Sequence, residues 1–360
     1  MMDKNFDIEK INQEALSLLK SLIETPSISG QEDEAAELIG RFLTIKDIPF
    51  ERKINNIWLK NTYFDQNKPT LLLNSHIDTV KPNAGWQKNP YEAAEKDGKL
   101  TGLGSNDAGA SVVSLLSAFI YFKDRQDLSH NIIFAATAEE ETSGANGITA
   151  ILADLGKIDL AIVGEPTDMD MAVAEKGLIV IDCEAKGVSG HAARDLGVNA
   201  ILQAYDDIEW FSNYKFDRIS KFLGPVKMTV TMINAGYQHN VIPDRCTFTV
   251  DIRTTDAYTH DEILDVIKQN IKGEIARCSL RLNPSSIPED HLLVKTALEM
   301  GIRTYGSPTL SDQALIQTAS IKMGPGKSER SHTAEEFIYI EELNTGIQKY
   351  IELLENFLTK

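Results

Sequence analysis

The sequence lacks any long apolar run. No stretch of its 360 residues approaches about 18 consecutive apolar positions, the length typical of a membrane-spanning helix. The first 22 residues are charged and amphipathic, without the uninterrupted apolar core of a signal peptide. Internal repeats and low-complexity tracts are also absent. We therefore expect a chain with neither a membrane-spanning helix nor a secretion signal.

Cysteine and positive charge are also scarce. The three cysteines, Cys183, Cys246 and Cys278, are odd in number and lack the spacing of metal ligands. We expect reduced thiols, buried or inert, in a cytoplasmic protein. Lysine and arginine total 36 against 53 aspartates and glutamates, a formal net charge of -17. Because nucleic acids and anionic membranes are bound mainly through basic side chains, neither is an expected partner.

The length and the order of the sequence patterns predict two domains. A chain of 360 residues exceeds the ~250–300 residues at which a single core stops growing. Apolar residues recur with helical spacing over 8–24, and Ser29 is a possible cap of a second helix. Apolar strands alternate with helices up to residue 177, which predicts a mixed-sheet α/β domain with helices on both faces.

The pattern changes at residue 178. Alternating strands and amphipathic helices follow in the order β-α-β-β-α, which indicates a smaller α+β module. The α/β character then returns beyond residue 288. We predict a discontinuous α/β domain of residues 1–177 and 289–360. An inserted domain of residues 178–288 is expected to have a four-stranded antiparallel sheet and two helices.

Side chains with ligand chemistry gather where apolar strands end. Three strands are followed, respectively, by His76 and Asp78, by Glu139, Glu140 and Glu141, and by Glu165, while Asp107 lies in a glycine-rich turn before an apolar helix. In open α/β sheets the ligand site lies outside the carboxyl ends of the strands. Crowded carboxylates repel one another unless a cation neutralises them, and this nitrogen and oxygen donor set suits zinc or a related divalent ion. The pattern predicts a metal site with carboxylates enough to bridge two ions.

Each of these positions also has a simpler interpretation. The three glutamates are compatible with a solvated acidic turn, and Asp107 with an N-terminal helix cap. His76 and Asp78 are compatible with an ordinary strand end, although Asp78 is placed to accept a hydrogen bond from one ring nitrogen of His76. His332 lies in a polar loop that we expect to open the C-terminal helix.

Taken together, the chain resembles the two-zinc aminoacylase/carboxypeptidase G superfamily of metallo-amidohydrolases, with motifs closest to the acetylornithine deacetylases. The resemblance rests on SHIDTV, GLGSNDAGA, ATAEEETS, VGEPT, SGHAAR, HNVIPD with DIR, and a late GPG and SH, in family order over nearly the whole chain. It implies an α/β metal-binding catalytic domain, an inserted lid and dimerisation domain, and a homodimer. It also implies a cis peptide between Asp107 and Ala108.

The resemblance implies a role for each matching residue. The implied ligands of two Zn²⁺ ions, which Co²⁺ or another divalent ion would replace, are His76, Asp107 as the bridge, Glu141, Glu165 and His332. Glu140 is the implied general base, although the run of three glutamates leaves Glu139 and Glu140 as an alternative pair. Asp78 is implied to support His76, and His191 to stabilise the oxyanion.

For substrate binding, the resemblance implies Arg253 and Asn240 near the substrate carboxylate, and the backbone N–H groups of Gly324 and Gly326. Arg253 lies on an alternating strand, so a surface ion pair is the competing interpretation. For His191 the competing interpretation is a histidine that makes a hydrogen bond within a turn.

The implied reaction is removal of an acyl group from a small N-acyl amino acid in arginine biosynthesis, with N-acetylornithine, N-acetylcitrulline or N-succinylornithine as substrate. Alternatives of the same chemistry are a succinyl-diaminopimelate desuccinylase and a dipeptidase or carboxypeptidase. A two-metal phosphoesterase and a metal-stabilised binding protein without catalysis are alternatives from other classes.

Overall fold

The computed structural model describes residues 7–194 and 196–359. The chain divides into two compact units. Unit 1 contains the described residues up to Val173, then Ser286–Tyr305, then those from Ser311 onward. Unit 2 contains Ala174–Ser285 and Gly306–Leu310. The sequence placed the boundaries at Gly177 and near residue 288, and it did not anticipate that residues 306–310 join unit 2.

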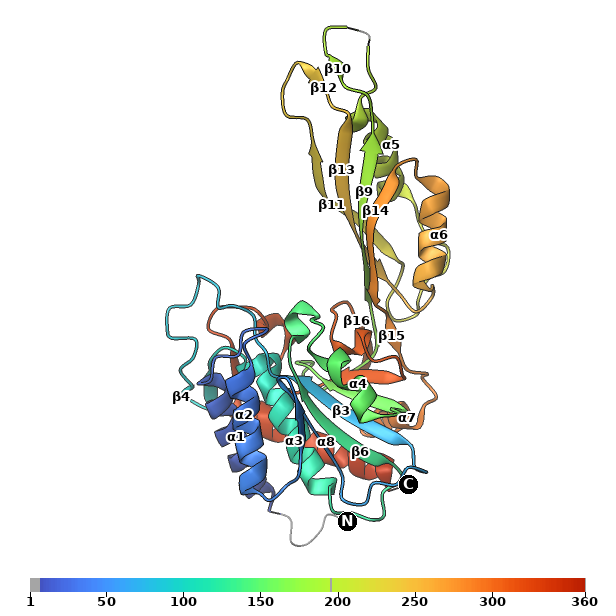
Figure 1. The fold of residues 1–360 in the computed structure, drawn as a ribbon. Helices are drawn as coiled ribbons and strands as arrows, with labels where there is room; N and C mark the ends of the chain where they lie inside the picture. Colours follow the sequence, from blue (N-terminus) through green and yellow to red (C-terminus); the bar gives the residue numbers. More distant parts are fainter. Residues whose placement is uncertain (1–6, 195, 360) are drawn as a thin grey trace. The chain divides into compact units, whose positions relative to one another are not determined.

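A large mixed sheet organises unit 1 (Figure 1). In spatial order its strands are β1 (Glu51–Lys53), β2 (Asn56–Lys60), β6 (Asn131–Thr137), β3 (Thr70–His76), β7 (Leu160–Gly164), β17 (Ser320–Met323), β8 (Met171–Glu175) and β15 (Ser285–Ser286), and β16 (Thr304–Ser307) pairs with β8. Strands β6, β3, β7 and β17 are parallel, whereas β2 and β8 are antiparallel to their neighbours β6 and β17. A smaller sheet joins β18 (Phe337–Tyr339), β5 (Lys99–Thr101) and β4 (Ala94–Lys96).

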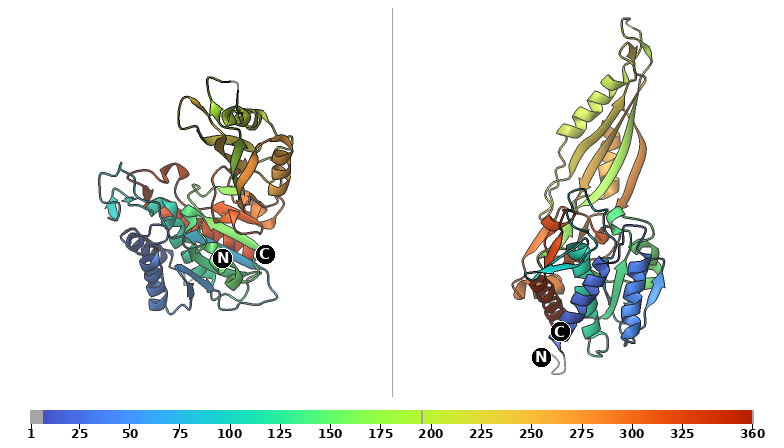
Figure 2. Two further views of the ribbon diagram at one scale, coloured as in Figure 1. Left: turned by 45° about the horizontal axis from the view of Figure 1, so that its top comes forward. Right: turned by 90° about the vertical axis from the view of Figure 1, so that its left-hand side faces the viewer.

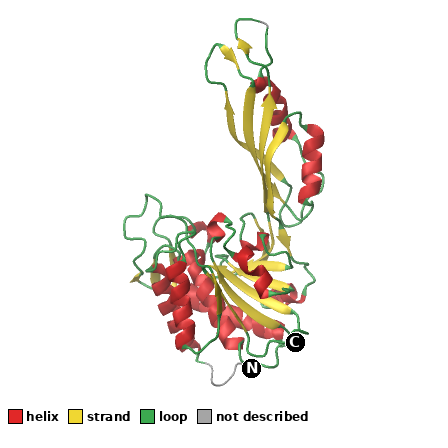
Figure 3. Ribbon diagram, in the orientation of Figure 1, coloured by secondary structure: helices red, strands yellow, loops and turns green. Residues whose placement is uncertain are grey.

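Helices cover both faces of the large sheet (Figure 3). They are α1 (Ile8–Ile23), α2 (Asp33–Ile45), α3 (Ala110–Phe122), α4 (Ile148–Leu155), α7 (Leu292–Glu299) and α8 (Ile340–Leu358). Helix α4 packs through Ile148 and Ile151 on one face, against Leu72 and Ile133 of the central strands. Helix α3 packs on the other face, where Phe119 lies against Phe134. Strands buried on both faces read as continuous apolar runs, and β3 and β6 are buried along their whole length.

The first helix is confirmed, but the predicted cap of the second is wrong. Helix α1 begins after Asp7, whose carboxylate accepts the N–H of Lys10, and residues 1–6 lie outside the described part of the chain. Helix α2 is preceded by Glu32 and has no side-chain cap. The Ser29 hydroxyl instead donates to the carboxylate of Asp78, 2.6 Å away. Ser29 therefore stabilises Asp78 at the end of β3 and does not cap the helix.

Unit 2 is an α+β module. Its main sheet has the order β11 (Lys227–Ala235), β13 (Arg245–Thr254), β9 (Gly177–Lys186) and β14 (Glu274–Leu282), with antiparallel neighbours throughout. Helices α5 (Ala200–Asn213) and α6 (His260–Asn270) pack on one face, and α5 runs along the strands (Figure 2). Alternate residues of β9 and β13, such as Ile181 and Val250, form the core with them. A short pair, β10 (Gly190–His191) and β12 (Val241–Ile242), lies outside this sheet.

The predicted fold class is thus confirmed: a mixed α/β sheet with helices on both faces, and a separate four-stranded antiparallel sheet. The cysteines are all unpaired, with Cys183 and Cys246 buried as expected. Cys278 is exposed on the edge strand β14. None of the helices in residues 7–194 and 196–359 has the length and apolar character needed to cross a membrane.

Candidate metal centre

The parallel strands of unit 1 bring the predicted ligands to one edge of the sheet. In the register of β3 with β6, His76 lies opposite Thr137, the last residue of its strand. Glu140 and Glu141 follow in a short turn, η2 (Glu140–Thr142), and Glu165 directly follows β7. Carboxyl ends of parallel strands meet at the same edge, so residues far apart in the sequence converge there.

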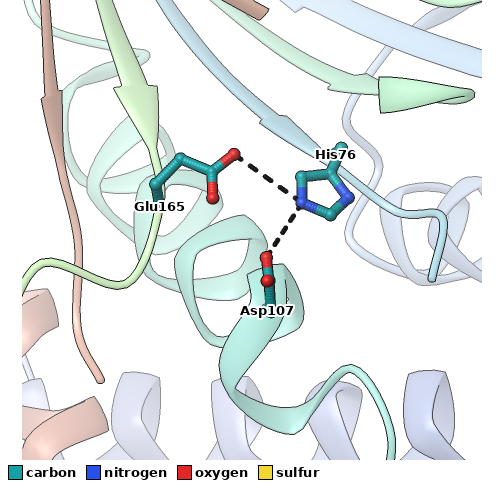
Figure 4. A group of neighbouring side chains, drawn as sticks. All are labelled: His76, Asp107 and Glu165. Atoms are coloured by element: carbon teal, nitrogen blue, oxygen red, sulfur yellow. Dashed lines mark hydrogen bonds and ion pairs between the residues drawn. The ribbon is translucent and has the colours of Figure 1, made fainter. Parts of the chain in front are cut away.

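The first group of possible ligands contains His76, Asp107 and Glu165, whose side chains converge in Figure 4. The Nε2 atom of His76 lies 3.2 Å from Oδ1 of Asp107 and 3.7 Å from Oε1 of Glu165. Ligand atoms bound ~2.0–2.2 Å from a tetrahedral zinc lie roughly 3.4 Å from one another. The spacing of this group therefore suits one metal ion.

The second group contains Asp107, Glu141 and His332. The Nε2 atom of His332 lies 2.9 Å from Oε2 of Glu141 and 3.7 Å from Oδ2 of Asp107. Asp107 therefore turns one carboxylate oxygen toward each histidine, which is the arrangement required of a bridging ligand. The side chain of His332 remains 54% exposed, whereas His76 is almost wholly buried.

The loop around His332 differs from the prediction. Residues 333–336 do not open the C-terminal helix, because strand β18 intervenes and α8 begins only at Ile340. The loop follows the short turn η4 (Ser328–Arg330). The interpretation of His332 as only a capping loop residue is wrong, since its ring contacts Glu141 from 191 positions away in the chain.

The turn after β6 separates the three consecutive glutamates. The Glu139 carboxylate turns back and accepts hydrogen bonds from the main-chain and side-chain nitrogens of Asn146 at 3.0 and 2.8 Å. Glu141 contacts His332, and Glu140 Oε2 lies 4.0 Å from Nε2 of His76. This geometry favours Glu140 and Glu141 over Glu139 and Glu140 as the paired residues.

Asp78 supports both sides of the centre, in a way that differs from the expectation. The Nδ1 atom of His76 lies 2.9 Å from the main-chain carbonyl of Asp78, with the carboxylate farther away at 3.3 Å. A carbonyl can only accept, so Nδ1 carries a ring proton and Nε2 is the nitrogen that faces Asp107. The Asp78 carboxylate instead accepts the main-chain N–H groups of Glu140 and Glu141 at 3.0 and 3.1 Å.

Asp107 lies in a tight turn, η1 (Ser105–Gly109), that precedes α3. Its peptide bond to Ala108 is cis, as expected. The helix begins at Ala110 after Gly109, so the interpretation of Asp107 as the helix cap is wrong. Sequence reasoning missed Glu336, a buried residue whose carboxylate accepts the main-chain N–H groups of this turn. No local pattern distinguished it from its half-buried neighbour Glu335.

The charges of the centre suit a bound cation. Burial raises the pKa of Glu140 and of Glu165 well above the usual range, and neighbouring carboxylates add to both shifts. The hydrogen bond to Glu141 raises the pKa of His332 to about 9. Burial lowers the pKa of His76, but its bonds to Asp107 and Asp78 outweigh this and raise it. These four side chains thus favour their protonated forms, and a metal ion bound among them would supply positive charge in place of the protons.

The donor set also fits a metal ion independently of these pKa values. Oε1 of Glu165 is buried and has no hydrogen-bond partner among the described residues, yet it points toward Nε2 of His76. Buried polar atoms are normally hydrogen-bonded, so an unpaired oxygen facing other donors indicates a ligand site. Imidazole and carboxylate donors without a thiolate are typical of Zn²⁺ and similar divalent ions.

Within unit 2, the structure brings two of the predicted residues together. His191 pairs with Val241 across β10 and β12, and the N–H of Ala192 donates to the carbonyl of Asn240 at 2.9 Å. The Nδ1 atom of His191 accepts the N–H of Ala193, so the ring carries its proton on Nε2, ready to donate. Oδ1 of Asn240 is buried and has no hydrogen-bond partner among residues 7–194 and 196–359.

Arg253 and Gly324 are already engaged. The Arg253 guanidinium makes two hydrogen bonds to the Asp251 carboxylate, at 2.9 and 3.0 Å, which is the ion pair anticipated as the alternative. The N–H of Gly324 donates to Oγ1 of Thr167 at 3.0 Å. In this structure the N–H is bonded within the chain, and its contact with a substrate stays a prediction. Gly326 keeps the left-handed conformation, with φ of 85°, that favours glycine.

Known sequences that this chain resembles also belong to metal-dependent hydrolases. The model of Peptidase family M20/M25/M40 matches residues 72–356. An acetylornithine deacetylase from Proteus mirabilis is 28% identical over 376 aligned positions, covering 95% of this chain and 96% of the relative. A succinyl-diaminopimelate desuccinylase from Orientia tsutsugamushi is 27% identical over 294 positions, covering 76% of this chain and 75% of the relative.

Solved structures share the fold. The aminopeptidase PepT from Bacillus cereus matches with a TM-score of 0.77 at 17% identity, over 96% of this chain and 98% of that chain. The YXEP protein of Bacillus subtilis, described as a dinuclear metal binding peptidase from the M20 family, matches with a TM-score of 0.72 at 17% identity, over 96% and 98%. The predicted metal-dependent amidohydrolase is confirmed at the level of the family. With its family match over residues 72–356, the chain belongs to Peptidase family M20/M25/M40.

Proposed function

We propose that the protein hydrolyses the amide bond of an N-acyl amino acid and releases the free amino acid in arginine biosynthesis. N-acetylornithine is the proposed substrate, with N-acetylcitrulline and N-succinylornithine as close analogues. The observation that carries the proposal is the pair of ligand groups that share Asp107, with the Glu140 carboxylate beside them. The similarity to acetylornithine deacetylases over 95% of the chain supports the choice of substrate.

In this proposal the two groups would hold two Zn²⁺ ions. His76, Asp107 and Glu165 would hold one, and Asp107, Glu141 and His332 would hold the other. Two bound divalent cations would acidify a water molecule and polarise the substrate carbonyl. Both functions need the Asp107 carboxylate, because it belongs to both groups and so fixes the distance between them.

The proton steps belong to Glu140. Its carboxylate takes a proton from the attacking water and delivers it to the leaving amine nitrogen, a general base that becomes a general acid. The carboxylate is suited to this exchange because it lies 4.0 Å from Nε2 of His76 and belongs to neither ligand group. Asp78 keeps the residue in place by accepting its main-chain N–H.

The remaining roles concern the substrate. We propose His191 as the donor to the oxyanion, through the Nε2 proton that its bond to Ala193 leaves available. Arg253, Asn240 and the N–H of Gly326 are the proposed contacts of the substrate carboxylate. Arg253 would then have to bind substrate beside Asp251, or exchange one partner for the other.

A panel of substrates tests the proposal. We expect the zinc-loaded protein to release free amine from N-acetylornithine with a kcat/KM at least about tenfold above that for N-succinyl-diaminopimelate or a dipeptide. A substrate that differs from the correct one by even a small group typically loses ~10-fold or more in kcat/KM. If only the succinylated compounds release amine, the substrate is a succinylated amino acid and not N-acetylornithine. Release of phosphate from a phosphoester, without any amine from the panel, would contradict the reaction itself.

A succinylated amino acid is the second candidate. The desuccinylase relative is 27% identical, almost the same as the 28% of the deacetylase, so identity alone does not separate the two acyl groups. The same panel decides between them through matched acetyl and succinyl derivatives of ornithine.

We also propose a cytoplasmic homodimer that assembles through unit 2. Unit 2 exposes apolar side chains on the edge strand β11, among them Met232 and Ile233, and on α5, among them Leu202 and Tyr205. Exposed edges and apolar patches are typical of interaction surfaces. Light scattering should give twice the mass of one chain, and Ile233→Asp should shift the protein toward a monomer. A monomeric parent protein would contradict the dimer.

A further inference from the structure

Glu336 is a buried carboxylate outside the two ligand groups. It lies between the loop of His332 and strand β18, with only 1% of its surface exposed. Placing a carboxylate in the interior is costly unless hydrogen bonds compensate for the lost water. The hydrogen bonds of the Glu336 carboxylate therefore indicate its role in the structure.

Among the described residues, the Glu336 side chain accepts three hydrogen bonds, and all of them come from the turn that carries Asp107. Oε1 accepts the main-chain N–H groups of Asn106 at 2.8 Å and of Asp107 at 2.9 Å. Oε2 accepts the N–H of Gly104 at 3.2 Å. The main-chain carbonyl of Glu336 also accepts the N–H of Gly102 at 3.0 Å. One residue thus holds the backbone from 102 to 107.

A second link joins the same two segments. The Asn106 side chain donates to the carbonyl of Lys327 at 3.1 Å and accepts the N–H of Lys327 at 3.0 Å. A Cβ on Gly326 would lie 2.3 Å from Oδ1 of Asn106, so this close approach requires glycine. The Asp107 turn is therefore fixed on both sides to the segment that presents His332.

The distance between the two ligand groups depends on this connection. Asp107 can face His76 and His332 at once only if its turn keeps its position relative to the His332 loop. Hydrogen bonds behind metal ligands orient those ligands, and their loss typically weakens metal affinity by ~10–100-fold. Glu336 supplies such bonds to the backbone rather than to the side chain of the shared ligand.

We propose that Glu336 is a positioning residue that sets the Asp107 turn against the His332 loop, and thereby allows one carboxylate to serve both metal ions. This inference rests on the proposed function only in taking Asp107 as the shared ligand. It adds a residue that acts through the backbone of Asp107 and touches neither metal nor substrate. Glu336 therefore governs metal binding, whichever acyl group the protein removes.

The test compares Glu336→Gln and Glu336→Ala with Glu335→Gln as the matched control. Glu335 is the preceding residue in the chain, and its carboxylate also accepts main-chain N–H groups, those of Gln87 and Lys88, but it is only half-buried and does not contact the Asp107 turn. Each purified full-length variant is stripped with a chelator and titrated with Co²⁺, whose visible absorption reports binding directly and without substrate.

We expect Glu336→Ala to bind Co²⁺ about 10–100-fold more weakly than the parent, with an altered absorption spectrum. Glu336→Gln should be intermediate, because its amide oxygen can still accept from Asn106 and Asp107 while its NH₂ group faces the N–H of Gly104. Glu335→Gln should bind within about twofold of the parent, since its bonds lie elsewhere. Thermal unfolding of the metal-free variants measures any purely structural effect.

Parental Co²⁺ affinity and spectrum in Glu336→Gln and Glu336→Ala would overturn the proposal. If Glu336→Ala fails to fold, the same-shaped Glu336→Gln decides the question. A loss of metal-free stability in Glu336→Gln with parental affinity once Co²⁺ is bound would also overturn it, because the role would then be structural only. Failure of the parent to release amine from any substrate would affect the proposed function and leave this metal-binding result standing.

Discussion

Replacing Glu140 by alanine should leave both metal ions bound and lower kcat by about 10²–10⁴-fold, the range attributed to general acid–base catalysis. The carboxylate lies 4.0 Å from Nε2 of His76 and belongs to neither ligand group, so its removal should take away the proton carrier alone. Metal content after dialysis and steady-state amine release measure the two effects separately.

Glu139→Gln is the control for this substitution. The Glu139 side chain is bonded to Asn146 and directed away from the ligand groups, so its neutralisation should leave kcat within about threefold of the parent, because a surface change of this kind shifts free energies by only a few tenths of a kcal/mol. Near-parental turnover in Glu140→Ala, or a larger loss in Glu139→Gln than in Glu140→Gln, would remove Glu140 as the base.

Replacing Asp107 by asparagine should empty both metal sites and reduce activity below detection. One of its oxygens faces His76 and the other faces His332, so the neutral amide withdraws charge from both groups at once. Asparagine also offers only one acceptor atom in place of two. Metal analysis should find about two ions in the parent and fewer than one in Asp107→Asn.

Two further variants make this prediction specific to a shared ligand. Glu165→Gln changes a residue of the first group only, and His332→Ala one of the second group only. Each should lose one ion and retain the other. If Asp107→Asn also retained one ion at parental affinity, Asp107 would belong to a single group and the bridge would be wrong.

The convergence of the centre could be predicted from the sequence because it depends on a local signal. Apolar strands that end in His76, in the three glutamates and in Glu165 are visible as a switch from apolar to polar residues. Parallel pairing then brings such ends together. The sequence could not show which two of the three glutamates lie near the ligand groups, because only the turn geometry shows that Glu139 turns back to Asn146.

The supporting contacts could not be predicted, because they use main-chain groups. A carboxylate that accepts backbone N–H groups leaves no pattern in the sequence of its partner. The sequence therefore placed Glu336 in the loop that was expected to open the C-terminal helix. Ser29 read as a helix cap for the same reason, although its hydroxyl bonds Asp78 49 positions away. Gly324 read as a free N–H donor, although Thr167 occupies that donor 157 positions away.

The spread of the centre along the chain has a consequence for biosynthesis. Glu141 and His332 are 191 positions apart, and the main-chain bond of Asp107 to Glu336 spans 229. Chains emerge from the ribosome N-terminal end first, so β3, β6 and β7 are synthesised long before the segment that completes the second group. A nascent chain therefore carries His76, Asp107 and Glu165 long before His332 can meet Glu141 or Glu336 can bind the Asp107 turn.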